Sequence, residues 1–269
     1  MCYDVQALTK KIIKYAESRG ATEEEVAILL KELEQLKDKK PIFHTSGYDH
    51  QELPVFTMES PLKPSLYQWG LIPNFVHRGE EALQISHKTL NARSETIFET
   101  KSYKDSITCR RCLVMVDGFY EHHHRNGKTF PFFIQKKDES PMYLAGIYDK
   151  AYVDGKEVNS VSIITTKGNE LMAKIHNNPA MEGPRMPVIL DKKDFDQWFN
   201  GKVSSKQDNE IFDLFQSYNA QALKAHTVNK IRGKELESNV PTISDPFKYK
   251  ELPNGVDSIR PDDEQLSLF

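Results

Sequence analysis

Apolar side chains near the start of the chain recur at helical spacing. They lie three or four positions apart between residues 5 and 16, and again between residues 26 and 36. A glycine follows the first run, and Thr22 with Glu25 has the spacing of a capping box before the second. The pattern predicts a helical hairpin over residues 5–39. Packing of this hairpin against the domain is favoured over use of its surface to bind a partner.

From residue 41 onward the pattern changes to short apolar runs broken by proline and glycine, which is typical of β-strands. Three such pieces lie between residues 41 and 73, and Gly127 in the sequence RNGK indicates a hairpin turn. Clearer strands are predicted at residues 113–120, 130–135, 142–148, 161–166 and 186–190. Shorter helices are predicted at residues 169–175, 192–199 and 211–215.

The order of these elements favours one fold class. Strand runs follow one another with few helices between them, which argues against a doubly wound parallel sheet. We therefore expect an α+β fold, with a barrel-like, largely antiparallel β core and peripheral helices. One domain is predicted over residues 1–240, with the hairpin as an insertion. Residues 241–269 are rich in Pro, Asp, Ser and Lys and are expected to form an extended tail.

Composition and charge narrow the cellular setting. The 269 residues carry a formal net charge of -3, so no global basic surface marks the chain for nucleic acid, although a local basic cleft is compatible with it. Three cysteines are an odd number, and the first residues lack the apolar run of a signal peptide. No stretch approaches the roughly 20 apolar residues of a membrane span. These features predict a cytoplasmic protein in which Cys2 is a free thiol.

The first two residues, Met1 and Cys2, offer a specific chemistry. Aminopeptidases remove an initiator methionine that precedes a small side chain, and cysteine is small. The mature chain would then begin with an amine and a thiol on one residue, which titrate near about 8 and about 8.5 in reference peptides. The amine can condense with an aldehyde to a Schiff base, and the thiol can close on the same carbon as a five-membered thiazolidine.

Two patterns resemble metal-binding sequences, but each is weak evidence for a metal site. Cys109-Arg-Arg-Cys112 is a CxxC sequence, but it has no second ligand pair in the chain. His122, His123 and His124 follow Glu121, yet metal ligands normally come from separated elements. We expect neither a metal nor a cofactor.

Five short motifs occur in order along the chain. They are Met1-Cys2, YQWGLIP at residues 67–73, LNARSET at residues 90–96, RCLVMVDGFYE at residues 111–121, and Ile175-His176 followed by RMPVIL at residues 185–190. Together they resemble the SRAP (SOS response-associated peptidase) family, whose members crosslink abasic sites in single-stranded DNA. The resemblance covers roughly residues 1 to 235 and implies the SRAP fold.

The resemblance implies a mechanism that matches the chemistry of Cys2. The Cys2 amine would attack the aldehyde of an opened abasic deoxyribose, and the thiol would close a thiazolidine that shields the lesion. Glu121 would be the acid/base at the amine and sugar, Asn91 would orient the terminal residue or the sugar, and His176 would assist ring opening. Glu121 also ends an apolar strand, where partial desolvation raises the pKa of a carboxyl toward the range useful for proton transfer.

The resemblance also implies contacts with DNA. Arg93 and Arg185 would hold phosphates, which fits the ability of a guanidinium to form two parallel hydrogen bonds. Trp69 is interpreted either as a core residue or as a stacking platform for an exposed base, worth about 1 to 3 kcal/mol. Basic side chains flank the Glu121 strand, where a DNA groove would need them: Arg110, Arg111, Arg125 and Lys128.

The chain departs from the family pattern at three places. Tyr3 and Asp4 follow Cys2 where the family usually has Gly-Arg, so a basic contact beside the nucleophile is lost. His122 stands where the family usually has a tryptophan that distorts DNA. Residues 177–184 separate His176 from the RMP motif, which would displace this histidine from its usual place.

The last five residues carry a separate prediction. Gln265, Leu266, Leu268 and Phe269 look like the pentapeptide by which bacterial repair and replication proteins dock onto the sliding clamp. A disordered segment of this kind exposes apolar side chains that a pocket can bury. We therefore expect two partners, single-stranded DNA with abasic sites and the sliding clamp, and a nucleoid-associated location.

Two other functions stay open on the sequence alone. In the first, Cys2 is the nucleophile of a thiol peptidase or autoprocessing enzyme that uses its own amine as the base and acts on amides without DNA. In the second, the chain is a non-catalytic adaptor that binds the clamp and does not need Cys2. The family resemblance favours a lyase-like crosslinking enzyme that also removes its own Met1.

Overall fold

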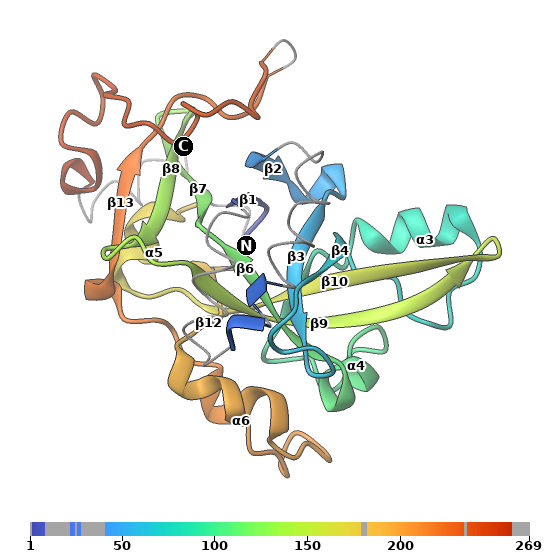
Figure 1. Cartoon of the computed structure of the whole chain (residues 1–269). Coiled ribbons are helices and arrows are strands. Elements are labelled where there is room, and N and C mark those ends of the chain that lie inside the picture. The colour runs from blue at the N-terminus through green and yellow to red at the C-terminus, as the bar shows by residue number, and fades with distance from the viewer. Residues whose placement is uncertain are drawn as a thin grey trace.

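The computed structural model describes residues 2–8, 22–24, 26–27, 41–178, 182–233 and 236–259. Their strands form two sheets with helices at the periphery (Figure 1). The strands are β1 (Asp4–Ala7), β2 (Ile42–Ser46), β3 (Glu52–Thr57), β4 (Ser65–Trp69), β5 (Asn91–Arg93), β6 (Arg111–Val116), β7 (Gly118–Arg125), β8 (Lys128–Lys136), β9 (Met142–Val153), β10 (Lys156–Lys167), β11 (Arg185–Pro187), β12 (Ile189–Leu190) and β13 (Leu223–Thr227).

Within these ranges, one sheet closes on itself as a five-stranded barrel. β10 pairs with β4, β4 with β3, β3 with β6, and β6 with β9, which returns to β10. β5, β11 and β12 add to this ring. The second sheet has the order β13-β8-β7-β1-β2 and is antiparallel throughout, whereas β10 pairs in parallel with β4 and β5. The expected α+β fold with a barrel-like, largely antiparallel core is confirmed.

Short helices lie around the sheets. In the described ranges from residue 41 onward, the α-helices are α3 (Gly79–Ser86), α4 (Lys104–Cys109), α5 (Glu170–Ile175) and α6 (Phe195–Asn200). The 3-10 segments are η2 (Gly47–Asp49), η3 (Lys192–Asp194), η4 (Phe212–Leu214), η5 (Ala220–Ala222) and η6 (Gly255–Ser258). In the part of the chain that the structure describes, no helix has the length and apolar character needed to cross a membrane.

The barrel strands are apolar on both faces because both faces are covered. Along β6, Val114 and Val116 belong to an inner core that the second sheet shares, and this core includes Cys2. The alternate side chains Leu113 and Met115 belong to an outer core with α4 and α6. A strand buried on both sides reads as a continuous apolar run, which is why the sequence revealed β6 so clearly.

The hairpin between β7 and β8 matches its prediction. Asn126 and Gly127 both have positive φ, at 51° and 69°, and Arg125 pairs with Lys128 across the turn. A two-residue turn with this backbone follows the right-handed twist of the strands, and Asn-Gly adopts it readily.

The single strand predicted over residues 113–120 is wrong. β6 ends at Val116 and β7 begins at Gly118, and the two strands belong to different sheets. The backbone N–H of Asp117 donates to Gln6, and a Cβ at Gly118 would lie 2.5 Å from the Phe133 ring. The chain therefore leaves the barrel at Asp117 and enters the second sheet at a glycine that has no room for a side chain.

The N-terminal helix prediction is also wrong where the structure can be compared with it. Asp4–Ala7 form β1, which lies between β2 and β7 in the second sheet. Residues 22–24 and 26–27 are helical in the expected place, apart from Thr22 itself, whose carbonyl accepts from the N–H of Val26. The remainder of the predicted hairpin, including Glu25 of the capping box, lies outside the described residues.

Residues 241–259 are not an extended tail. Ile243 and Leu252 are buried, and the backbone N–H of Phe247 donates to the carbonyl of Thr227 at the end of β13. The polar composition of this segment hid two apolar side chains, Ile243 and Leu252, that pack it against the rest of the protein. Residues 260–269, with the clamp-like motif, lie outside the described residues.

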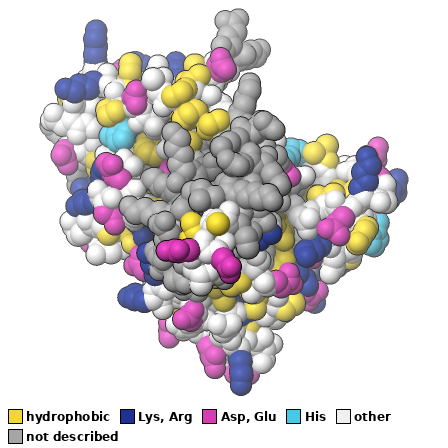
Figure 2. All heavy atoms as spheres, in the orientation of Figure 1, with side chains coloured by type: hydrophobic (Ala, Val, Ile, Leu, Met, Phe, Trp, Pro, Cys, Tyr) yellow, Lys and Arg dark blue, Asp and Glu magenta, His cyan; other side chains and the backbone are white. Residues whose placement is uncertain are grey.

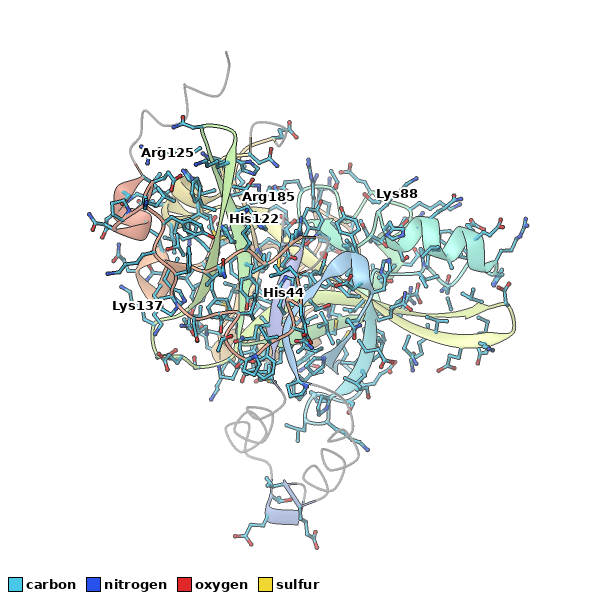
Figure 3. The ribbon with its side chains drawn as sticks, turned by 90° about the horizontal axis from the view of Figure 1, so that it is seen from above. His44, Lys88, His122, Arg125, Lys137 and Arg185 are labelled. Atoms are coloured by element: carbon cyan, nitrogen blue, oxygen red, sulfur yellow. The ribbon has the colours of Figure 1, made fainter. Side chains whose placement is uncertain are left out.

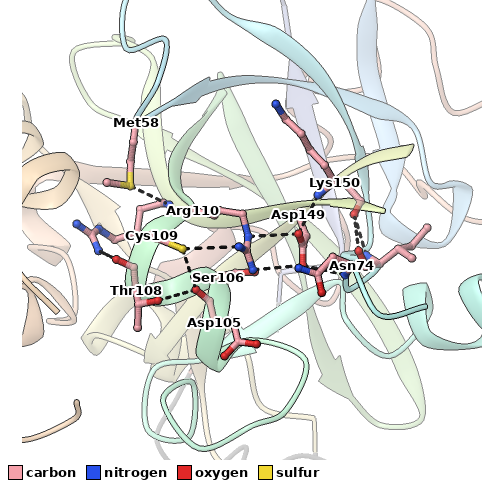
Figure 4. A network of polar contacts seen from close by, with 12 residues as sticks. Met58, Asn74, Asp105, Ser106, Thr108, Cys109, Arg110, Asp149 and Lys150 are labelled. Carbon is pink, nitrogen blue, oxygen red and sulfur yellow. Dashed lines mark hydrogen bonds and ion pairs between the residues drawn. The ribbon is translucent and has the colours of Figure 1, made fainter. Parts of the chain in front are cut away.

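The basic residues before β6 serve the fold and not a groove. Arg110 forms an ion pair with Asp149, with 3.2 Å between Nε and Oδ1, and Asp149 also accepts from the backbone of Asn74 (Figure 4). Arg111 is 1% exposed, and its five N–H groups donate to the carbonyls of Ile107, Thr108, Trp198, Phe199 and Gly201. The guanidinium of Arg111 thereby joins the ends of α4 and α6.

We predict that Arg111→Met lowers the free energy of unfolding by about 3–5 kcal/mol, because it leaves five carbonyls without their donor in the protein interior. Arg111→Lys should recover only part of this loss, since an ammonium has three donors in a different geometry. Urea unfolding followed by circular dichroism measures both. Arg78→Met, at an exposed arginine, is the matched control and should change stability by less than about 0.5 kcal/mol. Equal effects at the two positions would contradict the prediction.

Candidate functional site

The pairing of β1 with β7 brings the start of the chain to Glu121. In the antiparallel register Asp4 lies opposite Tyr120, so the residues before Asp4 run alongside those after Tyr120. Tyr3 and Glu121 line the same cavity. Burial, and after it the charge of Glu121, raises the pKa of the Cys2 thiol. The structure thus brings together the two residues to which the sequence assigned the chemistry.

Glu121 is a buried carboxyl with a shifted pKa. It is 8% exposed, and burial raises its pKa from 4.5 to about 7. Its Oε1 accepts a hydrogen bond of 3.0 Å from the backbone N–H of His122, and its Oε2 lies 3.4 Å from Nδ1 of His176. A carboxyl with this pKa can both accept and donate a proton near neutral pH.

His176 reaches Glu121 from the end of α5. Its Nδ1 accepts a 3.3 Å hydrogen bond from the backbone N–H of Arg185, and burial lowers its pKa to about 4. The side chain of Asn177 bonds both backbone groups of His124, at 2.7 and 2.8 Å, and so attaches the segment after α5 to β7. His176 thus lies beside Glu121 although residues 177–184 separate it from the RMP motif.

The contact between Glu121 and His176 is not an ion pair. Because the pKa of Glu121 is about 7 and that of His176 is about 4, a shared proton resides on the carboxyl and the imidazole stays neutral. Nδ1 is also 3.3 Å from the backbone N–H of Arg185, a contact in which a neutral imidazole nitrogen can accept. Near pH 7 the carboxyl of Glu121 is therefore the member of the pair that gains and loses a proton, and the imidazole beside it is uncharged.

Asn91 holds the backbone of Cys2 directly. Its Nδ2 donates a 2.8 Å hydrogen bond to the backbone carbonyl of Cys2. The backbone carbonyl of Asn91 accepts a 3.2 Å hydrogen bond from the hydroxyl of Tyr103. β5 carries Asn91 and is fixed by parallel pairing with β10. Among the described residues, no donor reaches the buried Oδ1 of Asn91. This oxygen is therefore able to accept a hydrogen bond from a group that enters the site.

A cavity of about 870 Å³ opens beside these residues. Its wall includes Tyr3, Tyr48, Glu121 and His176, and its basic side chains are Lys128, Lys230 and Arg232. It has the size of an ordinary small-molecule pocket and is large enough for a nucleotide-sized group.

Arg232 is anchored in that wall by Asp4. Asp4 is 1% exposed, and its carboxylate contacts Arg232 at 2.5 Å and Nε2 of His44 at 3.1 Å. His44 is in turn 2.8 Å from Ser238. The arginine side chain itself is half exposed. The sequence indicated that a basic contact beside Cys2 was lost, and the structure places an arginine from a distant segment against Asp4, two residues after Cys2.

A second cavity, of about 500 Å³, contains the two arginines that the sequence assigned to phosphates. Arg93 is 3.2 Å from Glu182, and both side chains are exposed, so a phosphate could replace this partner at little cost. Arg185 is buried and bonds Glu95 with two nitrogens, at 2.6 and 2.9 Å, and also the carbonyl of Thr165.

Trp69 contradicts the stacking interpretation. It is fully buried, and its indole N–H donates to the carbonyl of Leu90 at 2.9 Å. No face of the ring is open to a nucleobase, so the core interpretation of Trp69 holds. The indole packs beneath the turn at Gly47, where an added Cβ would lie 3.4 Å from it.

Neither the surface charges nor the two remaining cysteines point to a further binding site in the part of the chain that the structure describes. On the face shown in Figure 2, the described Lys and Arg side chains are interspersed with Asp and Glu and do not form one large basic area. Cys109 is exposed and Cys112 is buried. Within the described ranges, no three His, Cys, Asp or Glu side chains come together in a way that could hold a metal ion.

Sequence reasoning missed three residues that shape the site. Asn177 positions His176, Arg232 supplies a positive charge, and Tyr48 places an exposed ring at the cavity. Each acts through a partner far away in the sequence, and 228 positions separate Asp4 from Arg232. The one available signal was the aspartate directly after Tyr3, since a buried carboxylate requires a cation or several donors.

Comparison with known proteins agrees with this geometry. The chain is 34% identical to the abasic site processing protein YoqW of Bacillus subtilis (strain 168) over 166 residues, which are 61% of this chain and 68% of that protein. It is 31% identical over 144 residues to the abasic site processing protein HMCES of Xenopus tropicalis, 46% of this chain and 41% of that protein. A crystal structure of a protein from Bacteroides thetaiotaomicron covers 91% of this chain and all of its own, with 31% identity and a TM-score of 0.76.

A family model also matches most of the chain. The model described as SOS response associated peptidase (SRAP) matches residues 14–234, which include Asn91, Glu121 and His176. The motifs, the fold and these matches lead to the same assignment, and the chain belongs to the SRAP family.

Proposed function

We propose that this protein captures abasic sites in single-stranded DNA by a covalent bond through Cys2, after removal of Met1. The observation that carries the proposal is the convergence of Cys2, Asn91, Glu121 and His176 from four separate segments. Glu121 and His176 line the larger cavity together with Tyr3, the neighbour of Cys2. The names of the relatives, abasic site processing proteins, support the choice of substrate. Such a protein is expected in the cytoplasm, close to the nucleoid.

The thiol pKa supports an order of steps in which the amine reacts first. Burial and the Glu121 charge disfavour the Cys2 thiolate, so the thiol is a poor first nucleophile. The amine of Cys2 would attack C1′ of the open sugar, and loss of water would give an iminium ion. The thiol would then add to the same carbon as its proton leaves, which gives a thiazolidine. One water is released in total, and no oxidant or reductant is needed.

Glu121 and His176 are suited to the proton transfers in this sequence. The carboxylate of Glu121 can take the proton of the attacking amine and return it to the hydroxyl that leaves as water. The neutral imidazole of His176, beside Oε2 of Glu121, can hold a proton while the sugar ring opens. Asn91 Oδ1 can accept a hydrogen bond from the Cys2 amine, while Nδ2 keeps the residue in place.

Basic residues on both sides of these groups support a bound DNA backbone. Arg232 lies in the wall of the larger cavity and Arg93 in the wall of the smaller one. Each is partly exposed and so can donate to a phosphate oxygen. The assignment of Arg185 to a phosphate finds less support, because Glu95 occupies two of its nitrogens, and we propose that it orients His176 through its backbone.

We predict that Cys2→Ala abolishes a heat-stable band on a denaturing gel when the processed protein is mixed with single-stranded DNA carrying one abasic site. Cys2→Ser keeps the amine and should form a Schiff base, so its band should appear only when borohydride traps it. Cys109→Ala, at an exposed cysteine, is the control and should crosslink like the wild type.

Mass spectrometry of the wild-type chain should first show that Met1 is absent. A band that survives Cys2→Ala would contradict the mechanism. Turnover of amide substrates without DNA would favour the peptidase function, and removal of Met1 that depends on Glu121 would show autoprocessing. Full protection of cells by Cys2→Ser would favour an adaptor role.

The pKa of Glu121 predicts the pH dependence of capture. The carboxyl is protonated below about pH 7 and cannot accept the amine proton, so the crosslinking rate should rise through pH 7. Glu121→Gln should slow crosslinking by about 100-fold and remove the rise in rate through pH 7. The pH dependence that remains should be the titration of the amine near about 8. Single-turnover rates between pH 5.5 and 9 measure both, and an unchanged profile in Glu121→Gln would reject the role.

The same substitution should stabilise the protein at high pH. Because the folded pKa of Glu121 is raised above 4.5, its contribution to stability is present below pH 4.5 and is lost as the pH rises through about 7. Relative to the wild type, Glu121→Gln should therefore have a higher free energy of unfolding at pH 8. This gain should exceed the one at pH 5 by on the order of 1–3 kcal/mol. Measuring the unfolding of Glu121→Gln therefore shows whether slower crosslinking comes from lost chemistry or from lost folding.

We further propose that residues 265–269 dock the protein onto the sliding clamp, as the sequence QLSLF suggests. Deletion of these five residues should abolish co-purification with the clamp and leave crosslinking to naked DNA unchanged. Substitution of Ser267 by Ala is the matched control, because it keeps Gln265, Leu266, Leu268 and Phe269. A clamp pulldown that is indifferent to the deletion would reject this partner.

A further inference from the structure

A row of four rings begins at the residue next to Cys2. Tyr3 stacks on Tyr48 with 5.6 Å between ring centroids and 27° between planes. Tyr48 is 6.0 Å from His87 at 31°, and His87 is 4.7 Å from His50. Tyr48 is 49% exposed and His87 is exposed as well. Tyr3 also packs against the inner core, so the row is anchored at that end, whereas the exposed ring of Tyr48 belongs to no core cluster of the described residues and can take part in binding.

The row is held in place by the backbone and by hydrogen bonds. Tyr48 lies in η2, which begins with a capping box between Ser46 and Asp49, and the N–H of Gly47 donates 2.7 Å to the carbonyl of Tyr3. At the other end, Nδ1 of His50 is 2.7 Å from the carbonyl of Trp69, and its Nε2 is 3.2 Å from Nδ1 of His87. Rigid rings lose little entropy when a ligand binds, which favours their use in recognition.

The position of the row connects it with the capture site. Tyr3 and Tyr48 line the same cavity as Glu121 and His176, so the near end of the row opens on the place where a sugar would react. The far end reaches His87, and Lys88 follows it as an exposed cation near helix α3 (Figure 3). A flat aromatic surface with a cation beyond it is the combination that binds single-stranded nucleic acid without sequence preference.

We propose that Tyr48, supported by Tyr3 and His87, is a stacking subsite for the nucleobase of the nucleotide next to the abasic one. The inference rests on the proposed function and names residues that it does not include. An abasic nucleotide has no base of its own to stack, so the neighbouring base provides the binding energy that positions the sugar at Cys2. Every base has an aromatic face, so the subsite accepts all four.

The test removes the ring and the base separately and together. The probes are single-stranded oligonucleotides with one tetrahydrofuran, a stable abasic analogue without an aldehyde, and oligonucleotides with a second tetrahydrofuran on its 5′ or 3′ side. Binding is measured by fluorescence anisotropy at fixed salt for the wild type, Tyr48→Ala and Tyr48→Phe. Tyr152→Ala, at an exposed tyrosine on the β9–β10 hairpin that extends away from the site, is the matched control (Figure 1).

We expect Tyr48→Ala to weaken binding of the single-tetrahydrofuran DNA by about 10-fold. It should have almost no effect when the neighbouring base on one of the two sides is missing, which also identifies that side. Tyr48→Phe and Tyr152→Ala should bind like the wild type. Equal weakening of all three DNAs by Tyr48→Ala, or no weakening of any, would overturn the proposal.

The same variants separate this proposal from the proposed function. Crosslinking to a true abasic site is measured in parallel and depends on Cys2, whereas tetrahydrofuran binding does not involve a covalent bond. If the wild type crosslinks but Tyr48→Ala shows no dependence on the neighbouring base, the subsite is wrong and capture stands. If the wild type fails to crosslink while the ring and the base remain coupled, capture is wrong and the subsite stands.

Discussion

The antiparallel pairing of β1 with β7 is the constraint on which the site depends. It fixes Asp4 opposite Tyr120 and so places the first residues of the chain along the strand that carries Glu121. A shift of one residue would turn the side chains of β1 to the opposite face of the sheet and separate Cys2 from the carboxyl. The inner core, which Cys2 and Val5 share with both sheets, holds this register because β1 cannot slide without exposing apolar surface.

Burial at this register has opposite effects on stability and on chemistry. It raises the pKa of Glu121 to about 7, which disfavours the charged carboxyl in the folded protein and makes it a proton carrier at the pH of a cell. It also lowers the pKa of His176 to about 4, so the imidazole stays neutral near pH 7. The loss of stability as the pH rises through about 7 and the proton transfer that we propose for Glu121 thus have one physical cause, the desolvation of this carboxyl.

Much of the fold could be predicted from local patterns. β6 is apolar throughout because both faces are covered, and the Asn-Gly turn after β7 has a backbone that few other residues adopt. The errors occurred where tertiary pairing overrode the local pattern. Residues 4–7 follow helical spacing as well as strand alternation, and only the partners β2 and β7 decide between the two. The break at Asp117 depends on which sheet each half joins, and a sequence does not show that.

The sequence identified candidate residues of the site but not the contacts between them. Asp4 shows why. A carboxylate that is 1% exposed must be paired, and its partners Arg232 and His44 come from distant segments. Asp4 and Arg232 are therefore a unit: the carboxylate keeps the arginine at the cavity, and the arginine makes the buried carboxylate tolerable. Tyr3 likewise stacks on Tyr48, which comes from another segment of the chain. Departures from a family pattern next to a nucleophile are understood through what they contact, because the residue that replaces a lost charge need not lie near it in sequence.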